Sequence, residues 1–125
     1  MIILLSPQVR DFNKIWYEIK NQKVTATIND NSDTFDFADM PDGILQMEDE
    51  EGNRLIETVL DEVPILGATK ENGVLTVEIL FTIDMNEQDE RLLFPKPMTL
   101  DEFNALMKEL AKRKSEKKEE VELDG

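Results

Sequence analysis

The sequence contains neither cysteine nor histidine, and each absence excludes a class of chemistry. Without cysteine the chain has no disulfide framework and no thiolate metal site. Without histidine it lacks the commonest general base and the commonest transition-metal ligand. A reducing cytoplasm suits such a composition, and disulfide-dependent or histidine-dependent functions are excluded.

Glycine is scarce, and its five occurrences stand apart from one another. A phosphate-binding loop needs glycines grouped at fixed spacing, so that class of site is not predicted. No serine lies in a Gly-x-Ser-x-Gly frame, and the many acidic residues do not single out one catalytic pair. We therefore expect no enzyme activity, no cofactor and no small-molecule ligand.

Long apolar runs are also missing. Met1–Leu5 is apolar, but it is too short for a signal peptide or a membrane span, so we interpret it as a first strand and expect no membrane association. With 125 residues, 40% of them hydrophobic, the chain is long enough for one domain with a modest core.

Negative charge is abundant. There are 28 acidic and 14 basic residues, a formal net charge of −14, and the part before Thr99 has 20 acidic and 8 basic residues, a net charge of −12. Such a chain is repelled by nucleic-acid phosphates and anionic lipids, so we expect no direct nucleic-acid binding. The acidity serves solubility, or it forms a face for a basic partner; the sequence leaves both open.

The most distinctive stretch is 34–43. Phe35 and Phe37 are two residues apart, so a strand places both rings on one face and Asp36 on the other. Pro41 and Gly43 then predict a turn that leads into the second half of the domain. We expect the two rings to anchor the core.

Alternating and apolar segments predict further strands around this stretch. We expect a strand at 2–5 stopped by Ser6-Pro7, a hairpin of 15–20 with 23–28, a third strand at 34–37, and a hairpin of 65–69 with 74–83 around Asn72-Gly73. The segment 74–83 is the longest apolar run, which favours a central strand. A further hairpin of 44–47 with 54–59 is predicted, with a helix at 53–61 as its alternative.

One helix is predicted over 99–114. Thr99 and Glu102 form a capping box, and Met98 can pack onto Phe103. Phe103, Leu106, Met107 and Leu110 form an apolar stripe that either docks on the sheet or forms an oligomer interface. The charged tail 115–125 should be frayed helix or disordered. The prediction is a mainly β (α+β) fold: an antiparallel meander or sandwich-like domain over 1–98 with one C-terminal amphipathic helix.

Two patterns admit a functional interpretation beside a structural one. The aspartates at 30, 33, 36, 39 and 42 suggest a cation site, but the offsets do not fit a calcium loop, so capping of turns is the simpler interpretation and no metal site is predicted. Trp16 and Tyr17 are adjacent, so one ring should face the core and the other solvent, where it could contact a partner.

The order of these motifs resembles a family of small acidic bacteriophage and prophage proteins found among tail genes. The resemblance covers about 1–98 and includes the opening apolar strand with Ser6-Pro7, Phe35-Asp36-Phe37, Pro41-Asp42-Gly43, the strand led by Gly73, and Phe94-Pro95-Lys96-Pro97. It implies no catalytic residue. It implies a role in tail structure or assembly, in the host cytoplasm during assembly and in the virion tail.

Three functions remain open from the sequence. The first is a structural or assembly protein that contacts other tail proteins or copies of itself. The second is an acidic inhibitor that mimics nucleic-acid charge and blocks a basic site on a host defence or transcription protein. The third is a tail-fibre chaperone that is released before the virion matures.

Overall fold

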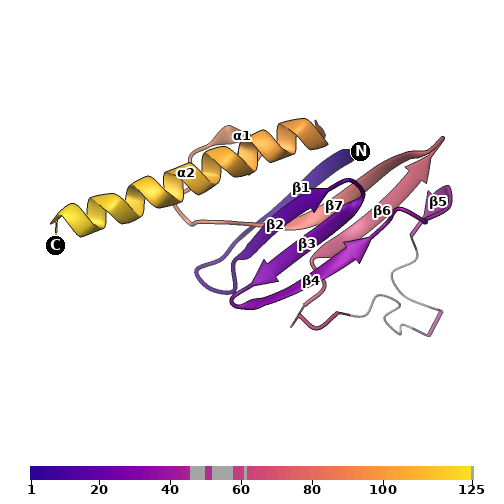
Figure 1. Cartoon of the computed structure of the whole chain (residues 1–125), viewed down its shortest axis with the longest axis horizontal. Helices are drawn as coiled ribbons and strands as arrows, with labels where there is room; N and C mark the ends of the chain where they lie inside the picture. The colour runs from indigo at the N-terminus through magenta and orange to yellow at the C-terminus, as the bar shows by residue number, and fades with distance from the viewer. Residues whose placement is uncertain (46–49, 52–57, 61, 125) are drawn as a thin grey trace.

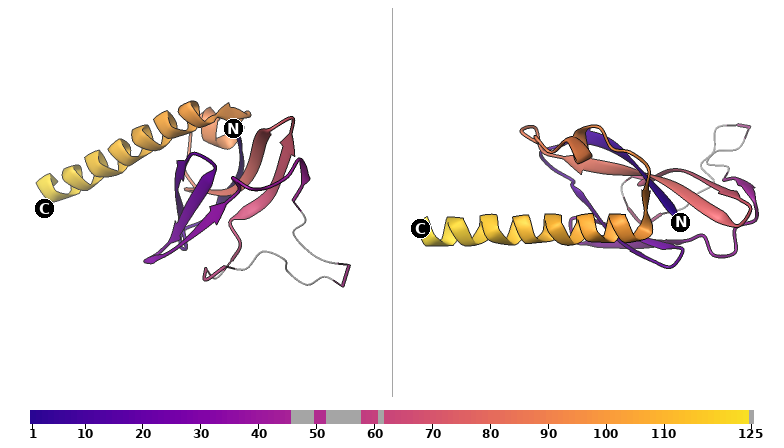
Figure 2. Two further views of the ribbon diagram at one scale, coloured as in Figure 1. Left: turned by 45° about the vertical axis from the view of Figure 1, so that its right-hand side comes forward. Right: turned by 90° about the horizontal axis from the view of Figure 1, so that it is seen from above.

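The computed structural model describes residues 1–45, 50–51, 58–60 and 62–124, with side chains described no further than Arg113. Among these residues, eight strands form two sheets, and a long C-terminal helix lies along one side of them (Figures 1 and 2). Side chains from both sheets and from the helix share one apolar core. The predicted mainly β fold with one C-terminal helix is confirmed.

The smaller sheet is the predicted meander. It consists of β2 (Ile15–Lys20), β3 (Lys23–Ile28) and β4 (Asn31–Asp36), all antiparallel. Buried and more exposed residues alternate along β2 and β3, as the period-two pattern requires. β4 begins at Asn31, earlier than the predicted Thr34, because Asn29 has a φ of 55° and the turn closes within two residues.

The larger sheet has the strand order β5-β6-β7-β1-β8. The predicted hairpin around Asn72-Gly73 is formed by β6 (Ile65–Glu71) and β7 (Val74–Ile83). Asn72 and Gly73 have φ values of 51° and 81°, as expected for a turn that needs positive φ at both positions. β7 lies in the middle of the sheet, as its long apolar run predicted.

The first strand is longer than predicted. β1 (Ile2–Val9) continues through Ser6-Pro7 and pairs in parallel with β7 along its whole length. The predicted stop at Pro7 was wrong because β8 (Met98–Thr99) pairs only with Ile2 and Ile3, so at Pro7 one side of β1 has no strand in the described chain. Proline is tolerated at such an edge because the missing N–H has no ladder bond to make.

The prediction for the segment after Phe37 needs correction. The amide of Met40 donates to the carbonyl of Phe37 at 3.1 Å, so the hydrogen-bonded turn closes before Pro41. Gly43, with a φ of 134°, begins β5 (Gly43–Ile44), and Ile44 pairs with Thr69 of β6. The rest of the predicted second hairpin, and most of its alternative helix, lie outside the described residues.

The C-terminal helix begins as predicted. In α2 (Leu100–Asp124) the capping box is formed: the Thr99 amide donates to Glu102 Oε1 at 3.0 Å, and the Glu102 amide donates to Thr99 Oγ1 at 3.2 Å. The stripe faces the core, since Phe103, Leu106 and Met107 are buried. The helix backbone continues past the predicted end to Asp124, so residues 115–124, expected to be frayed helix or disordered, have helical backbone.

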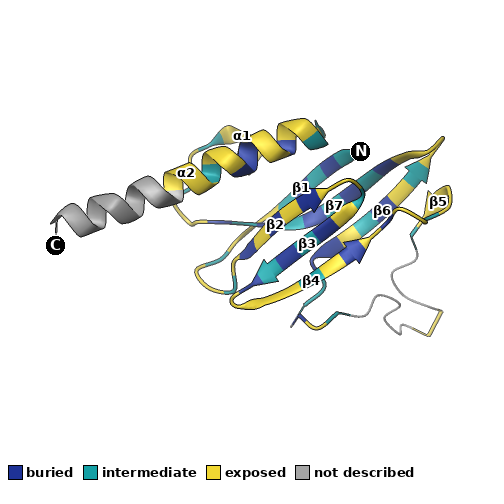
Figure 3. Cartoon of the chain, in the orientation of Figure 1, coloured by how far each residue is buried: buried dark blue, intermediate teal, exposed yellow. Residues whose placement is uncertain are grey.

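α2 covers the side of the molecule where β1, β2 and β8 approach one another. Its buried residues lie in its first part, and its last turns extend past the sheets (Figures 1 and 3). A short helix that the sequence analysis did not predict, α1 (Glu90–Leu93), precedes β8 and buries Leu92. No helix in the described chain combines the length and the apolar character that a membrane crossing needs.

Candidate functional site

The residues predicted to anchor the domain contribute mainly to its core. Phe35 and Phe37 are buried with Asp36 exposed between them, and Phe103 and Leu106 are buried on α2. Leu110 is half-buried, whereas Pro41 is exposed. Gly43 and Gly73 occupy positive-φ positions at the starts of β5 and β7. These side chains and turns organise the structure, so a site has to be sought elsewhere.

Three of the five aspartates of the 30–42 series, Asp33, Asp36 and Asp42, cap nearby backbone or side-chain donors. Asp33 accepts hydrogen bonds from the Thr34 amide at 2.9 Å, the Thr58 hydroxyl at 2.7 Å and the Val59 amide at 3.2 Å. The bond from Thr58, followed by those from the two amides, lowers the pKa of Asp33 despite partial burial. Asp36 accepts from the Ala38 amide, and Asp42 from the Gly73 amide.

These contacts agree with the turn-capping interpretation of the aspartate series. The carboxylates of Asp33, Asp36 and Asp42 accept from separate backbone segments. Within the described residues, no group of three or more acidic side chains is placed to hold a metal ion.

A concave region of about 620 Å³ lies at the connection between β1 and β2. We call it the β1–β2 hollow; it is lined by Gln8, Val9, Arg10, Asp11, Phe12, Asn13 and Glu62. Phe12 is 74% exposed and Val9 is 54% exposed. The hollow therefore combines exposed apolar side chains with polar and charged groups.

An ion pair between Arg10 and Glu62 lies in the β1–β2 hollow. Arg10 Nη2 donates to Glu62 Oε2 at 2.9 Å, Nη1 bonds the other oxygen, and Nε donates to Gln8 Oε1 at 2.6 Å. The hydrogen bond to Glu62 raises the pKa of Arg10, and the bond from Arg10 lowers the pKa of Glu62. Both groups stay charged near neutral pH, so neither is poised to exchange a proton.

Tyr17 lies buried beneath this region and joins the two sheets. Its hydroxyl donates to the carbonyl of Leu80 on β7 and lies 3.5 Å from the carbonyl of Pro64. Burial, and then the negative charge of Glu62, raises the pKa of Tyr17. The adjacent Trp16 is on the solvent side of β2, as the alternation predicted.

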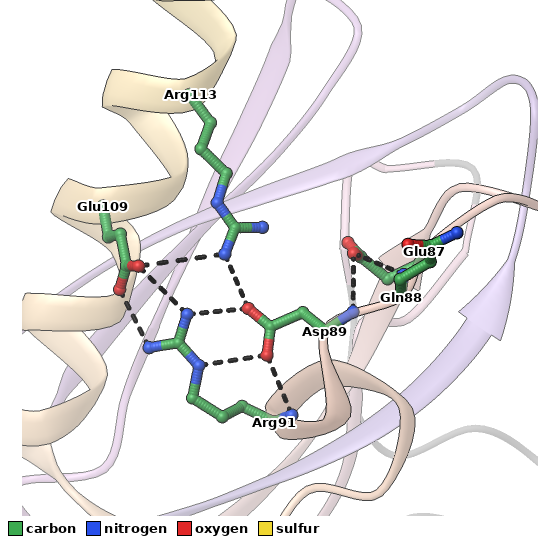
Figure 4. A network of polar contacts seen from close by, with 6 residues as sticks. All are labelled: Glu87, Gln88, Asp89, Arg91, Glu109 and Arg113. Atoms are coloured by element: carbon green, nitrogen blue, oxygen red, sulfur yellow. Dashed lines mark hydrogen bonds and ion pairs between the residues drawn. The ribbon is translucent and has the colours of Figure 1, made fainter.

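A second group of charged residues joins α1 to α2 (Figure 4). We call it the ion-pair cluster, and it consists of Asp89, Arg91, Glu109 and Arg113. Asp89 contacts Arg91 at 2.7 Å and Arg113 at 2.6 Å, and Glu109 binds Arg91 at 2.9 Å. The hydrogen bonds from Arg91 and Arg113 hold the pKa of Asp89 well below its ordinary value.

Sequence reasoning did not identify either charged group. Arg10 and Glu62 are 52 residues apart, and Asp89 and Arg113 are 24 apart, so no local spacing relates them. Only the ion pair of Glu109 with Arg113 could have been predicted from the sequence, because the two residues are four apart on a predicted helix. Phe12 gave no signal either, because an isolated phenylalanine in a loop is as compatible with a core position as with an exposed one.

The geometry of the β1–β2 hollow suits contact with another macromolecule. Exposed aromatic and aliphatic side chains are the groups that gain most from burial at an interface, and the neutralised Arg10–Glu62 pair offers polar contacts at its edge. Comparisons of the chain with protein-family models, with curated proteins and with solved structures found no match.

Proposed function

We propose that the protein is a non-enzymatic structural or assembly protein of a bacteriophage tail that acts through protein–protein contacts. The observation that carries the contact role is the exposure of Phe12 and Val9 in the β1–β2 hollow. Ile44, Met85 and Phe94 are also exposed apolar side chains on the described surface. The resemblance to small phage and prophage tail-gene proteins supplies the biological context.

Mass spectrometry of purified virions tests this role. The virions should come from the phage or induced prophage that carries the gene, and the protein should be present at a fixed ratio to other tail proteins. Its absence from virions that assemble normally contradicts the structural role. A requirement for the gene without incorporation would instead indicate an assembly factor such as a chaperone.

A pair of matched variants tests the contact surface. Phe12→Ser and Phe94→Ser each remove a phenylalanine ring that is about three-quarters exposed, and only Phe12 lines the β1–β2 hollow. We expect Phe12→Ser to lower incorporation into tails and Phe94→Ser to leave it unchanged. Equal incorporation of both variants would show that the β1–β2 hollow is not the contact.

The acidic composition favours a second candidate, an inhibitor that mimics nucleic-acid charge. Part of that charge is compensated, because Asp84 pairs with Lys14, and Asp89 pairs with Arg91 and Arg113. A pulldown from host lysate over a salt series tests this candidate. Charge mimicry predicts that capture of a host protein falls steeply with salt, and capture that is insensitive to salt counts against it.

A further inference from the structure

In the part of the chain that the structure describes, the larger sheet packs one of its two faces into the core. Along β7 the odd-numbered residues from Leu75 to Ile83 are buried, whereas the even-numbered residues between them are half-buried. We call the second side the outer face; it comprises the even-numbered positions 2–6 of β1 and 76–80 of β7, with Ile44, Gly67 and Thr69. None of these residues is buried, and the smaller sheet lies on the opposite side (Figure 2).

An open outer face is unusual for the parallel pair of strands at the centre of this sheet. β1 and β7 run parallel to each other. Parallel strands are normally covered on both faces and contain nearly continuous apolar runs. Ile2–Leu5 is such a run, and it places Ile2 and Leu4 on the outer face, where Leu80 of β7 joins them. The outer face therefore has the side chains of a surface that another layer covers.

The outer face carries almost no charge. Glu78 is its single charged residue, although 34% of the chain is charged and the net charge is −14. Depletion of charged side chains distinguishes the centre of a protein interface from the rest of a surface. A basic partner needs a group of carboxylates to bind, which this face lacks. A partner with the same negative charge needs the reverse, a contact area that keeps its carboxylates away from those of the chain.

We propose that the outer face packs against the outer face of a second copy of the chain. The same surface then meets itself about a twofold axis, so the contact closes at two chains. Stacked sheets lie about 10 Å apart, and their side chains interdigitate. A recess of about 160 Å³ beside Leu4 and Gly67 gives the outer face relief for this packing, and Ile44, which also lines the recess, is 83% exposed. The contact shares no residue with the β1–β2 hollow, and it does not depend on the tail role.

The size of the larger sheet predicts a reversible dimer. At about 3.3 Å per residue and about 4.8 Å between strands, its five strands cover roughly 460 Å² as a flat surface. Two such surfaces bury about 900 Å² before side-chain relief is added, which is close to the roughly 1,200 Å² at which stable interfaces begin. We therefore expect a dimer that dissociates on dilution, with a dissociation constant of about 1–100 μM.

Sedimentation equilibrium over a series of protein concentrations measures this association. Between about 1 μM and about 1 mM protein, the average mass should rise from the 14.4 kDa of one chain towards twice that value and no further. Raising the salt from about 0.15 M to about 1 M should strengthen the association, because salt screens the repulsion between two chains of net charge −14 and leaves apolar contacts intact. The mass of one chain at the highest concentration in both salts, or a mass above two chains, overturns the proposal.

A large side chain placed on the outer face tests whether that face makes the contact. A Cβ atom added at Gly67 meets no atom within 4 Å in the single chain, so Gly67→Arg obstructs a second copy without disturbing the fold. Asn104→Arg, at an exposed position of α2, is the control with equal net charge. Thermal denaturation checks that both variants fold.

Both arginine variants are less negative than the wild type, so general repulsion alone predicts that both associate more strongly. We expect Gly67→Arg to weaken the dimer by at least about tenfold, and Asn104→Arg to leave it unchanged or slightly stronger. Equal dissociation constants for the two variants overturn the proposal.

A second pair of variants should strengthen the dimer instead of weakening it. Glu78 is half-buried on the outer face and loses water when a second copy covers it. A carboxylate buried without a partner is costly, so Glu78→Gln should tighten the dimer by about tenfold. Glu18→Gln removes the same charge at an exposed position of the smaller sheet and should change the dissociation constant by less than about twofold. Equal tightening by both variants would indicate general repulsion alone and overturns the proposal.

Because the chain contains no cysteine, an introduced thiol can be cross-linked at one known position. Thr76→Cys places a thiol on the outer face, and Thr27→Cys places one at a similarly half-buried position of the smaller sheet. A bifunctional maleimide that spans about 10 Å, the distance between stacked sheets, should join two copies of Thr76→Cys and leave Thr27→Cys as single chains. Equal cross-linking of the two variants overturns the proposal.

The same variants separate this inference from the tail role. A chain that is monomeric at every concentration, but loses incorporation into virions in Gly67→Arg, overturns the proposal, because the outer face then binds a different tail protein. A chain that forms the dimer but is missing from virions supports the proposal and contradicts the tail role.

Discussion

At the scale of single residues, the ring of Phe35 should carry a large share of the stability. It is buried on β4 of the smaller sheet, and Phe37 is buried just beyond the end of that strand. Phe35→Ala should lower the free energy of unfolding by roughly 3–5 kcal/mol, because transfer and cavity costs add. Chemical denaturation measures it, with exposed Asp39→Ala as the control. An unchanged midpoint for Phe35→Ala would show that the ring does not anchor the core.

Tyr17 is the single tyrosine of the chain, so its ionisation can be followed on its own. Burial raises its folded-state pKa above the ordinary value of 10.0, so its contribution to stability is complete below pH 10 and is lost as pH rises towards the folded-state pKa. Phenolate absorbance should therefore appear together with alkaline unfolding. Titration near pH 10 in a chain that remains folded would contradict its burial.

At the scale of elements, the capping box stabilises the first turn of α2. Thr99→Ala removes the hydroxyl that accepts the Glu102 amide and should cost about 1 kcal/mol. Thr99→Ser keeps an acceptor at the same position and should lose much less. Thermal denaturation followed by circular dichroism compares the two. Equal losses would show that the Thr99 methyl group, rather than its hydroxyl, matters.

The ion-pair cluster should make the attachment of α2 depend on pH. The folded-state pKa of Asp89 lies below its ordinary value of 3.8, so the stability that it contributes is complete above that pH and is lost as pH falls through the folded-state pKa. Its side chain is 11% exposed and accepts charge-assisted bonds, so Asp89→Asn should cost roughly 1–3 kcal/mol at neutral pH.

The difference between wild type and Asp89→Asn should therefore be constant from pH 7 to about pH 5 and shrink below pH 4. Denaturation at a series of pH values measures this. Asp11→Asn is a matched control because Asp11 is exposed. A wild-type advantage that grows as pH falls would contradict the role assigned to Asp89.

At the scale of the whole molecule, excess negative charge should limit stability. The chain has twice as many acidic as basic residues, so repulsion among carboxylates outweighs the ion pairs that salt also weakens. Raising salt from about 0.01 M to 0.15 M should increase the midpoint of thermal unfolding. The measurement belongs at protein concentrations where the chain is monomeric. A midpoint that falls with salt would mean that the ion pairs dominate.

Local sequence patterns were sufficient to predict those elements whose structure depends on neighbouring residues in the chain. The alternation over 15–28 predicted the β2–β3 hairpin, the Asn72-Gly73 turn predicted the β6–β7 hairpin, and the Thr99–Glu102 capping box predicted the start of α2. The structure contains all three. Each of these signals acts over a few neighbouring residues, so the information needed to interpret it is adjacent in the chain.

The predicted boundaries of strands were wrong where pairing with a segment far away in the sequence determines them. β1 passes through Pro7 because, in the described chain, β8 pairs with its first residues alone, and Ile44 pairs with Thr69, which is 25 residues away in the sequence. The length of α2 was underestimated because the predicted apolar stripe ends at Leu110, while its backbone continues to Asp124. The β1–β2 hollow was missed because Arg10 and Glu62 meet only after both sheets have formed.

By itself, the sequence determined the mainly β character, the turns with positive φ, the amphipathic face of α2 and the large negative charge, because each depends on residue type and short-range spacing. Tertiary structure alone decided that β1 runs parallel to β7, that Phe12 is exposed beside an Arg10–Glu62 pair, and that Asp89 joins α1 to α2. Those features depend on contacts between residues far apart in the chain, and the free energy of such contacts exists only once the core has brought them together.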